Sequence, residues 1–152
     1  MTKTSKSKHD LAVIILAAGR GTRMKSKAPK ALHPLAGRPL IGWLLATVQL
    51  LKPARVVVVI GPDMDDLRAA VAPVPCVVQA KALGTGDAVK AALPALKGFK
   101  GDVLILLGDM PLISRATLKG LIKARHHDRD TGLAVLGAVY DHTPPFGRLV
   151  EN

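Results

Sequence analysis

Short apolar runs alternate with longer segments whose residue pattern is typical of helices along most of this chain. This alternation restricts the fold more than any other feature. Runs of Val, Ile and Leu without polar alternation are typical of strands buried on both faces of a sheet. Such runs occupy residues 11–16, 55–61, 76–79, 102–109 and 133–140. Helices are predicted between them, at residues 39–51, 63–72, 86–97 and 114–126, with Pro94 ending or kinking the third. We therefore predict an α/β fold, a doubly wound and mainly parallel Rossmann-like sheet with helices on both faces.

The length and composition favour one domain. A chain of 152 residues with 49% apolar residues can bury one compact core. Residues 1–10 are polar and rich in Lys and Ser, which predicts a disordered basic tail before a domain at 11–152. The start of the chain imitates a signal peptide, but its apolar part is short and cleavage there would remove the glycine-rich loop that follows. With Cys76 as the single cysteine and no membrane-length apolar run, we expect a cytoplasmic protein without membrane contact.

The positive charge is concentrated near the N-terminus. Residues 1–38 hold nine Lys or Arg and one acidic residue, so they carry +8 of the formal net charge of +11. Such a field suits a ligand that bears phosphate, either a nucleic acid or a nucleotide. Aromatic residues make up only 3% of the chain, and no RNA-binding signature is present. We therefore expect a nucleotide and no nucleic acid.

Three loops follow predicted strands, at residues 17–30, 80–86 and 108–112. In parallel sheets ligands bind beyond the carboxyl ends of the strands, so these loops should line one crevice. The first loop lies in the stretch "ILAAGRGTRMKSKAPK" and contains Gly19-x-Gly21, but neither a third dinucleotide glycine nor a P-loop Gly-Lys-Ser/Thr. Its small residues free backbone amides for phosphate oxygens, and Arg23 and Lys30 add fixed positive charge.

Four ordered motifs carry a resemblance to a known family. "LAAGRGTRM…PKALHPLAGRPL", "VVQAKALGTGDAV", "LLGDMPLIS" and "FGRLV" together cover about residues 11–150. They resemble the sugar-nucleotide nucleotidyltransferases, and among them the uridyltransferase domain of bacterial N-acetylglucosamine-1-phosphate uridyltransferases. The resemblance implies transfer of UMP from UTP to N-acetylglucosamine 1-phosphate, with release of pyrophosphate and with Mg²⁺ as cofactor. It leaves the oligomeric state open.

The resemblance also implies roles for particular residues. Arg23 and Lys30 would be catalytic, acting on the phosphates, and Asp109 would bind Mg²⁺, which takes one or two carboxylates together with phosphate oxygens. The remaining positions would bind substrate. They are Leu16, Ala17, Ala18 and Gly19 at the uridine, Gly21 at phosphate, Gln79, Gly84 and Thr85 at the base, Gly147 at the amino sugar, and Gly108.

Several positions depart from the family pattern. Asp87 stands where the family typically has His, Lys81 where the residue is often acidic, and Leu107 where an aromatic residue precedes Gly-Asp. The family's catalytic domain normally continues past "FGRLV", so we expect a domain truncated at its C-terminal end. Two alternatives stay open: a nucleotide-binding fragment or paralogue without efficient turnover, and a transferase for another sugar phosphate or nucleotide. Outside the motifs, Trp43 is predicted to belong to the core.

Overall fold

A computed structural model describes residues 10–19, 21, 26, 28–128 and 130–141 of the chain. Its contacts divide the chain into two compact units, Met1–Arg115 and Ala116–Asn152. The first unit holds the sheet. Among the described residues, no helix combines the length and the apolar character that crossing a bilayer requires.

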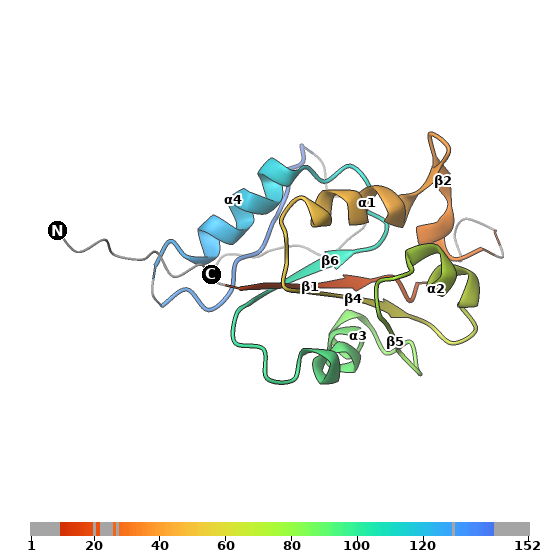
Figure 1. The fold of residues 1–152 in the computed structure, drawn as a ribbon. Helices are drawn as coiled ribbons and strands as arrows, with labels where there is room; N and C mark the ends of the chain where they lie inside the picture. The colour runs from red at the N-terminus through yellow and green to blue at the C-terminus, as the bar shows by residue number, and fades with distance from the viewer. Residues whose placement is uncertain (1–9, 20, 22–25, 27, 129, 142–152) are drawn as a thin grey trace. The chain divides into compact units, whose positions relative to one another are not determined.

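The sheet has four parallel strands in the order β5-β4-β1-β6 (Figure 1). They span Leu11–Leu16 (β1), Arg55–Ile60 (β4), Cys76–Val78 (β5) and Asp102–Leu107 (β6). The order places β4 and β5 on one side of β1 and β6 on the other, so the direction of winding reverses beside β1. In a doubly wound sheet this reversal opens a crevice at the carboxyl ends of the strands.

Helices cover both faces of the sheet, as predicted. Helices α1 (Leu40–Gln49) and α2 (Asp65–Val71) lie on one face, and α3 (Thr85–Ala92) lies on the other (Figure 1). The α-helical part of α3 stops at Ala92, and Pro94 falls in a following 3₁₀ turn, η3 (Leu93–Leu96). Proline has no N–H to donate to the preceding turn, so the predicted helix ends there. The predicted α/β fold is confirmed.

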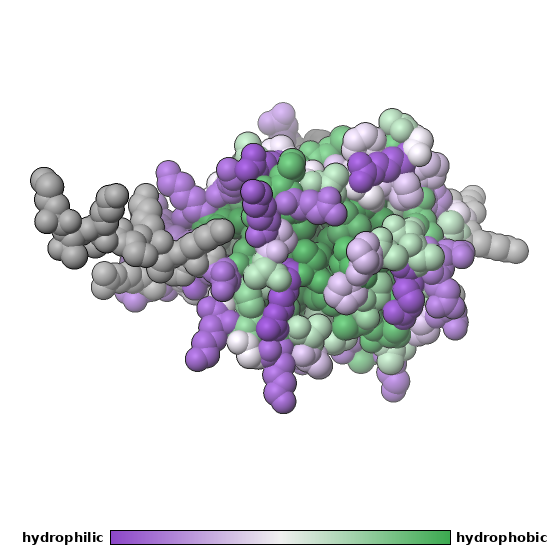
Figure 2. All heavy atoms as spheres, in the orientation of Figure 1, coloured by the Kyte–Doolittle hydropathy of each residue, from purple (hydrophilic) through white to green (hydrophobic). Residues whose placement is uncertain are grey.

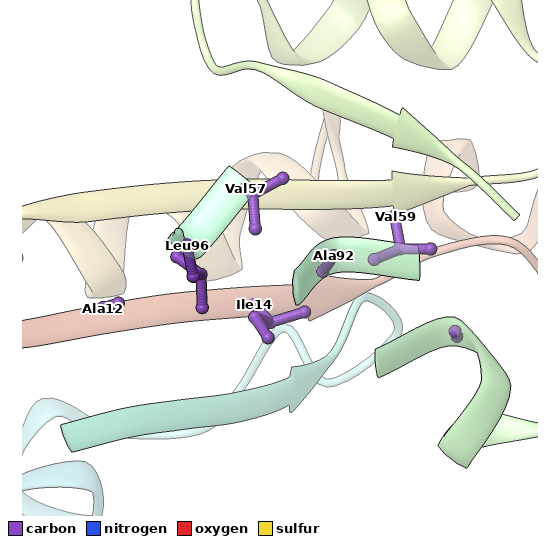
Figure 3. Packing of buried hydrophobic residues seen from close by; sticks show 7 residues of the cluster. Ala12, Ile14, Val57, Val59, Ala92 and Leu96 are labelled. Atoms are coloured by element: carbon purple, nitrogen blue, oxygen red, sulfur yellow. The ribbon is translucent and has the colours of Figure 1, made fainter. Parts of the chain in front are cut away.

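The core beneath α3 is built from small and branched side chains. Residues from β1 and β4 meet the inner face of α3 and η3 there (Figure 3). The buried members of this cluster are Ala12, Ile14, Val57, Val59, Ala88, Ala92 and Leu96. Figure 2 shows hydrophilic side chains standing out around apolar areas on the face in view.

A small hairpin that was not predicted from the sequence precedes α1. A 3₁₀ turn, η2 (Lys30–Leu32), is followed by the two-residue strands β2 (Pro34–Leu35) and β3 (Arg38–Pro39). Ala36 and Gly37 connect them with φ angles of 48° and 76°, the left-handed backbone of a tight hairpin turn. Strands this short give no periodic pattern in the sequence.

The prediction for Trp43 was wrong. Its side chain is 36% exposed, and its indole N–H donates to the carbonyl oxygen of Leu35 over 2.9 Å. The Arg38 guanidinium lies 5.2 Å from the centre of the Trp43 ring, within cation–π range. Trp43 therefore holds the hairpin against α1 instead of filling the core.

Helix α4 (Arg115–Arg125), which matches the predicted helix, lies in the second unit except for its first residue. The prediction of a strand at 133–140 was wrong, because these residues form no regular secondary structure. A strand is stable only where a neighbouring strand takes up its backbone hydrogen bonds, and no strand among the described residues pairs with this segment. Its apolar side chains, Val139 among them, are exposed.

Candidate functional site

A cavity of about 330 Å³ opens beyond the carboxyl ends of the strands in the first unit. All three loops that follow predicted strands contribute to it, as expected for the crevice of a parallel sheet. Its lining comes from the ends of β1 and β6, the loop between β5 and α3, the first turns of α3 and the start of η2. The lining residues are Leu16, Ala17, Ala18, Gly19, Lys30, Ala31, Gln79, Ala82, Gly84, Thr85, Ala88, Leu107, Gly108 and Asp109.

Backbone hydrogen bonds fix the floor of the cavity between three strands. The Ala17 N–H donates to the Val59 carbonyl, and the Gly108 N–H donates to the Leu16 carbonyl, each over 2.8 Å. A side chain at position 108 would fit only tightly, because a Cβ would lie 3.0 Å from Ala17 Cβ and 3.2 Å from the Leu16 carbonyl oxygen. The glycine therefore lets the ends of β1 and β6 approach closely.

An ion pair lies in the lining of the cavity. Lys30, the first residue of η2, places its Nζ 2.5 Å from Oδ2 of Asp109, which follows β6. The two side chains are 45% and 28% exposed. Gly21 packs directly against this lysine: its φ is +64°, and a Cβ there would lie 2.9 Å from Lys30 Cβ. One positive and one negative group are thus available side by side to a charged ligand.

The donor set of the cavity fits a metal ion that is shared with a ligand. Asp109 supplies carboxylate oxygens, which are the ligands that Mg²⁺ prefers. The described residues contain no cluster of three or more His, Cys, Asp or Glu that could hold a metal ion with protein side chains alone. An ion beside Asp109 would therefore complete its coordination with water and with oxygens of the ligand, such as phosphate oxygens.

A buried amide forms the opposite part of the lining. Gln79 directly follows β5 and is only 5% exposed. Its backbone N–H donates to the Ile60 carbonyl over 2.8 Å, and its side-chain Nε2 donates to the Gly84 carbonyl over 3.1 Å and to Asp87 Oδ2 over 2.8 Å. Gly84 precedes α3 with a φ of +104°, a conformation that other residues rarely adopt. The amide is therefore held from two directions.

The structure brings most of the predicted site residues together. Those that line the cavity are Leu16, Ala17, Ala18, Gly19, Lys30, Gln79, Gly84, Thr85, Gly108 and Asp109. Gly21 lies outside the lining but contacts Lys30. Arg23 and Gly147 lie outside the described residues, so their predicted roles stay predictions.

Sequence reasoning missed part of the apolar wall and one polar contact. Ala31, Ala82 and Ala88 line the cavity, and Ala88 could have been found from its place on the inner face of the predicted helix. The bond between Asp87 and Gln79 was also missed. The sequence shows Asp87 only as a departure from the family pattern. Its distance from Gln79 could not be predicted, because that distance depends on how the intervening loop folds.

The fold and the cavity define an α/β protein whose crevice, at the winding reversal, carries groups suited to a phosphate-bearing ligand. The family model for the MobA-like NTP transferase domain matches residues 13–148, and the chain belongs to this family.

Two curated relatives are similar over most of the chain. It is 56% identical to the bifunctional protein GlmU of Paramagnetospirillum magneticum over 140 residues, which cover 92% of this chain and 31% of the relative. It is 49% identical to the GlmU of Rhodospirillum rubrum over 152 residues, covering 100% of this chain and 32% of that one. The chain thus spans about a third of the length of the curated relatives that it matches.

Solved structures support the same fold. A 4-diphosphocytidyl-2C-methyl-D-erythritol synthase from Anaerococcus prevotii matches with a TM-score of 0.65 and 21% identity, covering 79% of this chain and 52% of that one. Rv0371c from Mycobacterium tuberculosis, solved as a manganese complex, matches with a TM-score of 0.60 and 24% identity over 76% of this chain and 59% of that one.

Proposed function

We propose that this chain transfers UMP from UTP to N-acetylglucosamine 1-phosphate and releases pyrophosphate. The observation that carries the proposal is the convergence of Lys30, Asp109 and Gln79 on one cavity at the carboxyl ends of the strands. The four motifs, and the similarity to relatives named GlmU, support the choice of substrates. The proposal places the activity in the domain at 11–152, the part of the chain that contains those motifs.

The chemistry is governed by charge. The attacking phosphate oxygen of the sugar phosphate is already ionised, so no general base is required. What the protein must supply is alignment and neutralisation, because a triphosphate and a phosphate monoester repel each other as they approach. In our proposal, Lys30 and Arg23 place positive charge on the phosphates around the α-phosphorus as its negative charge rises.

We propose that Asp109 holds a divalent metal ion, Mg²⁺ in the cell, against the triphosphate. When bound, such an ion neutralises phosphate charge and orients the phosphate oxygens. Asp109 pairs with Lys30 in the structure described above, so nucleotide binding would replace this ion pair with contacts from each group to the ligand. The manganese complex of Rv0371c supports a divalent metal in proteins of this fold.

The remaining site residues position the substrates. The backbone from Leu16 to Gly19 would contact the uridine, and Gly21 would let the loop approach a phosphate. Gln79, Gly84 and Thr85 would surround the base, with Gly108 on the floor of the cavity. Gly147 would approach the amino sugar.

Turnover by the 152-residue chain tests the proposal. Pyrophosphate release is measured with UTP, N-acetylglucosamine 1-phosphate and MgCl₂, with each substrate omitted in turn, and the sugar nucleotide is identified by mass spectrometry. The proposal requires UDP-N-acetylglucosamine to form only when both substrates are present. Faster product formation from CTP or from a different sugar phosphate would favour another nucleotidyl transfer. Nucleotide binding without any product would mean that this chain is a binding module only.

A further inference from the structure

We propose that Asp87 fixes the orientation of the Gln79 amide and thereby selects a nucleotide base that carries an N–H donor at N3, as uracil does. Asp87 would be a positioning residue, acting on the ligand through Gln79. This inference rests on the proposed function, because it requires the cavity to hold a nucleotide base. It assigns a role to a residue that departs from the family's usual histidine.

The orientation of the amide follows from the chemistry of its neighbours. The Gln79 atom assigned as Nε2 lies 2.8 Å from Asp87 Oδ2 and 3.1 Å from the Gly84 carbonyl oxygen. A carbonyl oxygen and a carboxylate oxygen can only accept hydrogen bonds, whereas an amide offers both a donor nitrogen and an acceptor oxygen. Only the nitrogen can face both of them, so the amide is oriented with Nε2 toward Asp87 and Gly84.

Rotation of this amide is disfavoured. Turning it by half a revolution would set Oε1 against both the Asp87 carboxylate and the Gly84 carbonyl. Gln79 is 5% exposed, so little water could compensate for these two contacts between acceptors. The Gly84 carbonyl oxygen also accepts a hydrogen bond from the Ala88 N–H over 3.2 Å, which helps to keep it in place. Both amide hydrogens are thus used within the protein, so in our proposal Oε1 is the amide atom that meets a base in the cavity.

An acceptor fixed in this position distinguishes the two common pyrimidines. Uracil carries a donor at N3, and its N3–H can be accepted by Oε1. Cytosine has an acceptor at N3, so Oε1 would face a second acceptor and no hydrogen bond could form between them. A loss of one buried hydrogen bond corresponds to a change of about tenfold to a hundredfold in affinity. Without Asp87 the amide could turn and present its NH₂ group, which suits cytosine.

Asp87 also lies in the first turn of α3, where a carboxylate stabilises a helix by interacting with its dipole. A test must separate that structural effect from positioning. Dissociation constants for UTP and for CTP in MgCl₂ are measured by calorimetry, and the ratio of the two is the readout. Loss of helix stability alone would weaken both nucleotides and leave the ratio unchanged.

The variants are Asp87→Asn, Asp87→Ser, Gln79→Ala and the double variant Gln79→Ala/Asp87→Asn, with Asp66→Asn as a control. Asp66 is an exposed carboxylate in the first turn of α2, so its variant makes the same change of charge away from the cavity. We expect the wild type and Asp66→Asn to prefer UTP by tenfold or more, and Asp87→Asn and Asp87→Ser to reduce the preference toward one. In the Gln79→Ala background, Asp87→Asn should leave the ratio unchanged.

The outcomes separate the inference from the proposed function. If the wild type prefers UTP and folded Asp87 variants keep the same preference, the inference is overturned while the function stands. The inference also fails if Asp87→Asn changes the ratio equally with and without Gln79. If the wild type binds neither nucleotide, the proposed function fails, and the inference fails with it.

Discussion

Lys30 Nζ lies 2.5 Å from Asp109 Oδ2, and the two residues come from the loops that follow β1 and β6, neighbouring strands of the sheet. Both side chains are partly exposed, and an ion pair of this kind contributes on the order of 0–1 kcal/mol to stability. The pair is therefore a weak explanation for the placement of these two residues. A ligand that carries phosphate and a metal ion explains it better.

Replacing the lysine should separate activity from stability. We expect Lys30→Ala to lower the rate of pyrophosphate release by roughly 10²- to 10³-fold, the cost of removing one preorganised charge at a reacting phosphate. Its free energy of unfolding in urea should change by less than about 1 kcal/mol. Lys90→Ala, at an exposed position on α3, is the matched control and should keep full activity. Normal turnover in Lys30→Ala would contradict the proposed role.

Replacing the carboxylate should remove the effect of the metal ion on nucleotide affinity. In the wild type we expect MgCl₂ to tighten UTP binding, because the ion joins the triphosphate to Asp109. In Asp109→Asn the dissociation constant should become nearly independent of MgCl₂, and turnover should be lost. Calorimetric titrations with MgCl₂ and with EDTA measure this, and Asp66→Asn serves as the control for charge. An Asp109→Asn chain that responds to MgCl₂ like the wild type would place the ion elsewhere.

A side chain at position 108 should destabilise the chain. In Gly108→Ala the new Cβ would meet Ala17 Cβ at 3.0 Å and the Leu16 carbonyl oxygen at 3.2 Å, so the ends of β1 and β6 must move apart. Overpacking of this kind costs about 1–3 kcal/mol, and nucleotide binding should weaken with it. Urea unfolding measures the stability.

The control for this variant is Gly120→Ala. Gly120 lies within α4, and nothing approaches the position of its Cβ within 4 Å. The added methyl group should leave stability unchanged or raise it by about 0.5–1 kcal/mol. Equal stability losses in the two variants would show that the contacts at Gly108 are unimportant.

Cys76 should react slowly as a thiol at neutral pH. Burial raises the pKa of this thiol above its ordinary value, and the positive charge of Arg68 opposes that rise only in part. Reaction with a disulfide reagent should therefore be slower in the native chain than in urea at pH 8, and it should continue to accelerate above pH 8.5, the ordinary thiol pKa. A native thiol that reacts as fast as the unfolded one would contradict this.

The raised pKa of the Cys76 thiol should also make the stability of the chain depend on pH. A pKa that is higher in the folded chain means that the folded state holds the thiol proton more tightly than the unfolded state does. The stabilisation that the protonated Cys76 thiol provides is fully present below the pKa of the unfolded chain. It is lost as the pH rises through the pKa of the folded chain. Stability should therefore fall in the alkaline range, and this part of the fall should be absent in Cys76→Ala.

Elements were predicted correctly where the local sequence pattern was sufficient to specify them, and wrongly where their structure depends on contacts with other segments. The continuous apolar run at 11–16 gave β1 its observed bounds, because a run buried on both faces leaves little ambiguity. The run at 133–140 has similar composition, yet it forms no strand, since strand formation also depends on a partner. Trp43 was misplaced because its contacts come from a hairpin too short to be predicted.

In the candidate site, too, some features could be predicted from the sequence and others depended on tertiary contacts. The crevice could be predicted from topology, because the carboxyl ends of parallel strands meet at one edge of the sheet. The bond between Gln79 and Asp87 could not, since it depends on the left-handed turn at Gly84 and on where α3 begins. The departure of Asp87 from the family pattern was visible in the sequence, but the role that we propose for Asp87 could be inferred only from its hydrogen bond with Gln79.

Nucleotide should bind in the cavity at the carboxyl ends of the strands, and an NMR titration locates the binding site residue by residue. UTP and MgCl₂ are added to the ¹⁵N-labelled chain, and backbone amide shifts are followed. We expect the largest changes at Ala17, Ala18, Gly84 and Gly108, which lie at or near the cavity, and small changes at Arg55 and Val56, where β4 begins. Changes confined to the amino ends of the strands, or saturable binding that leaves the cavity amides unshifted, would contradict nucleotide binding at this site.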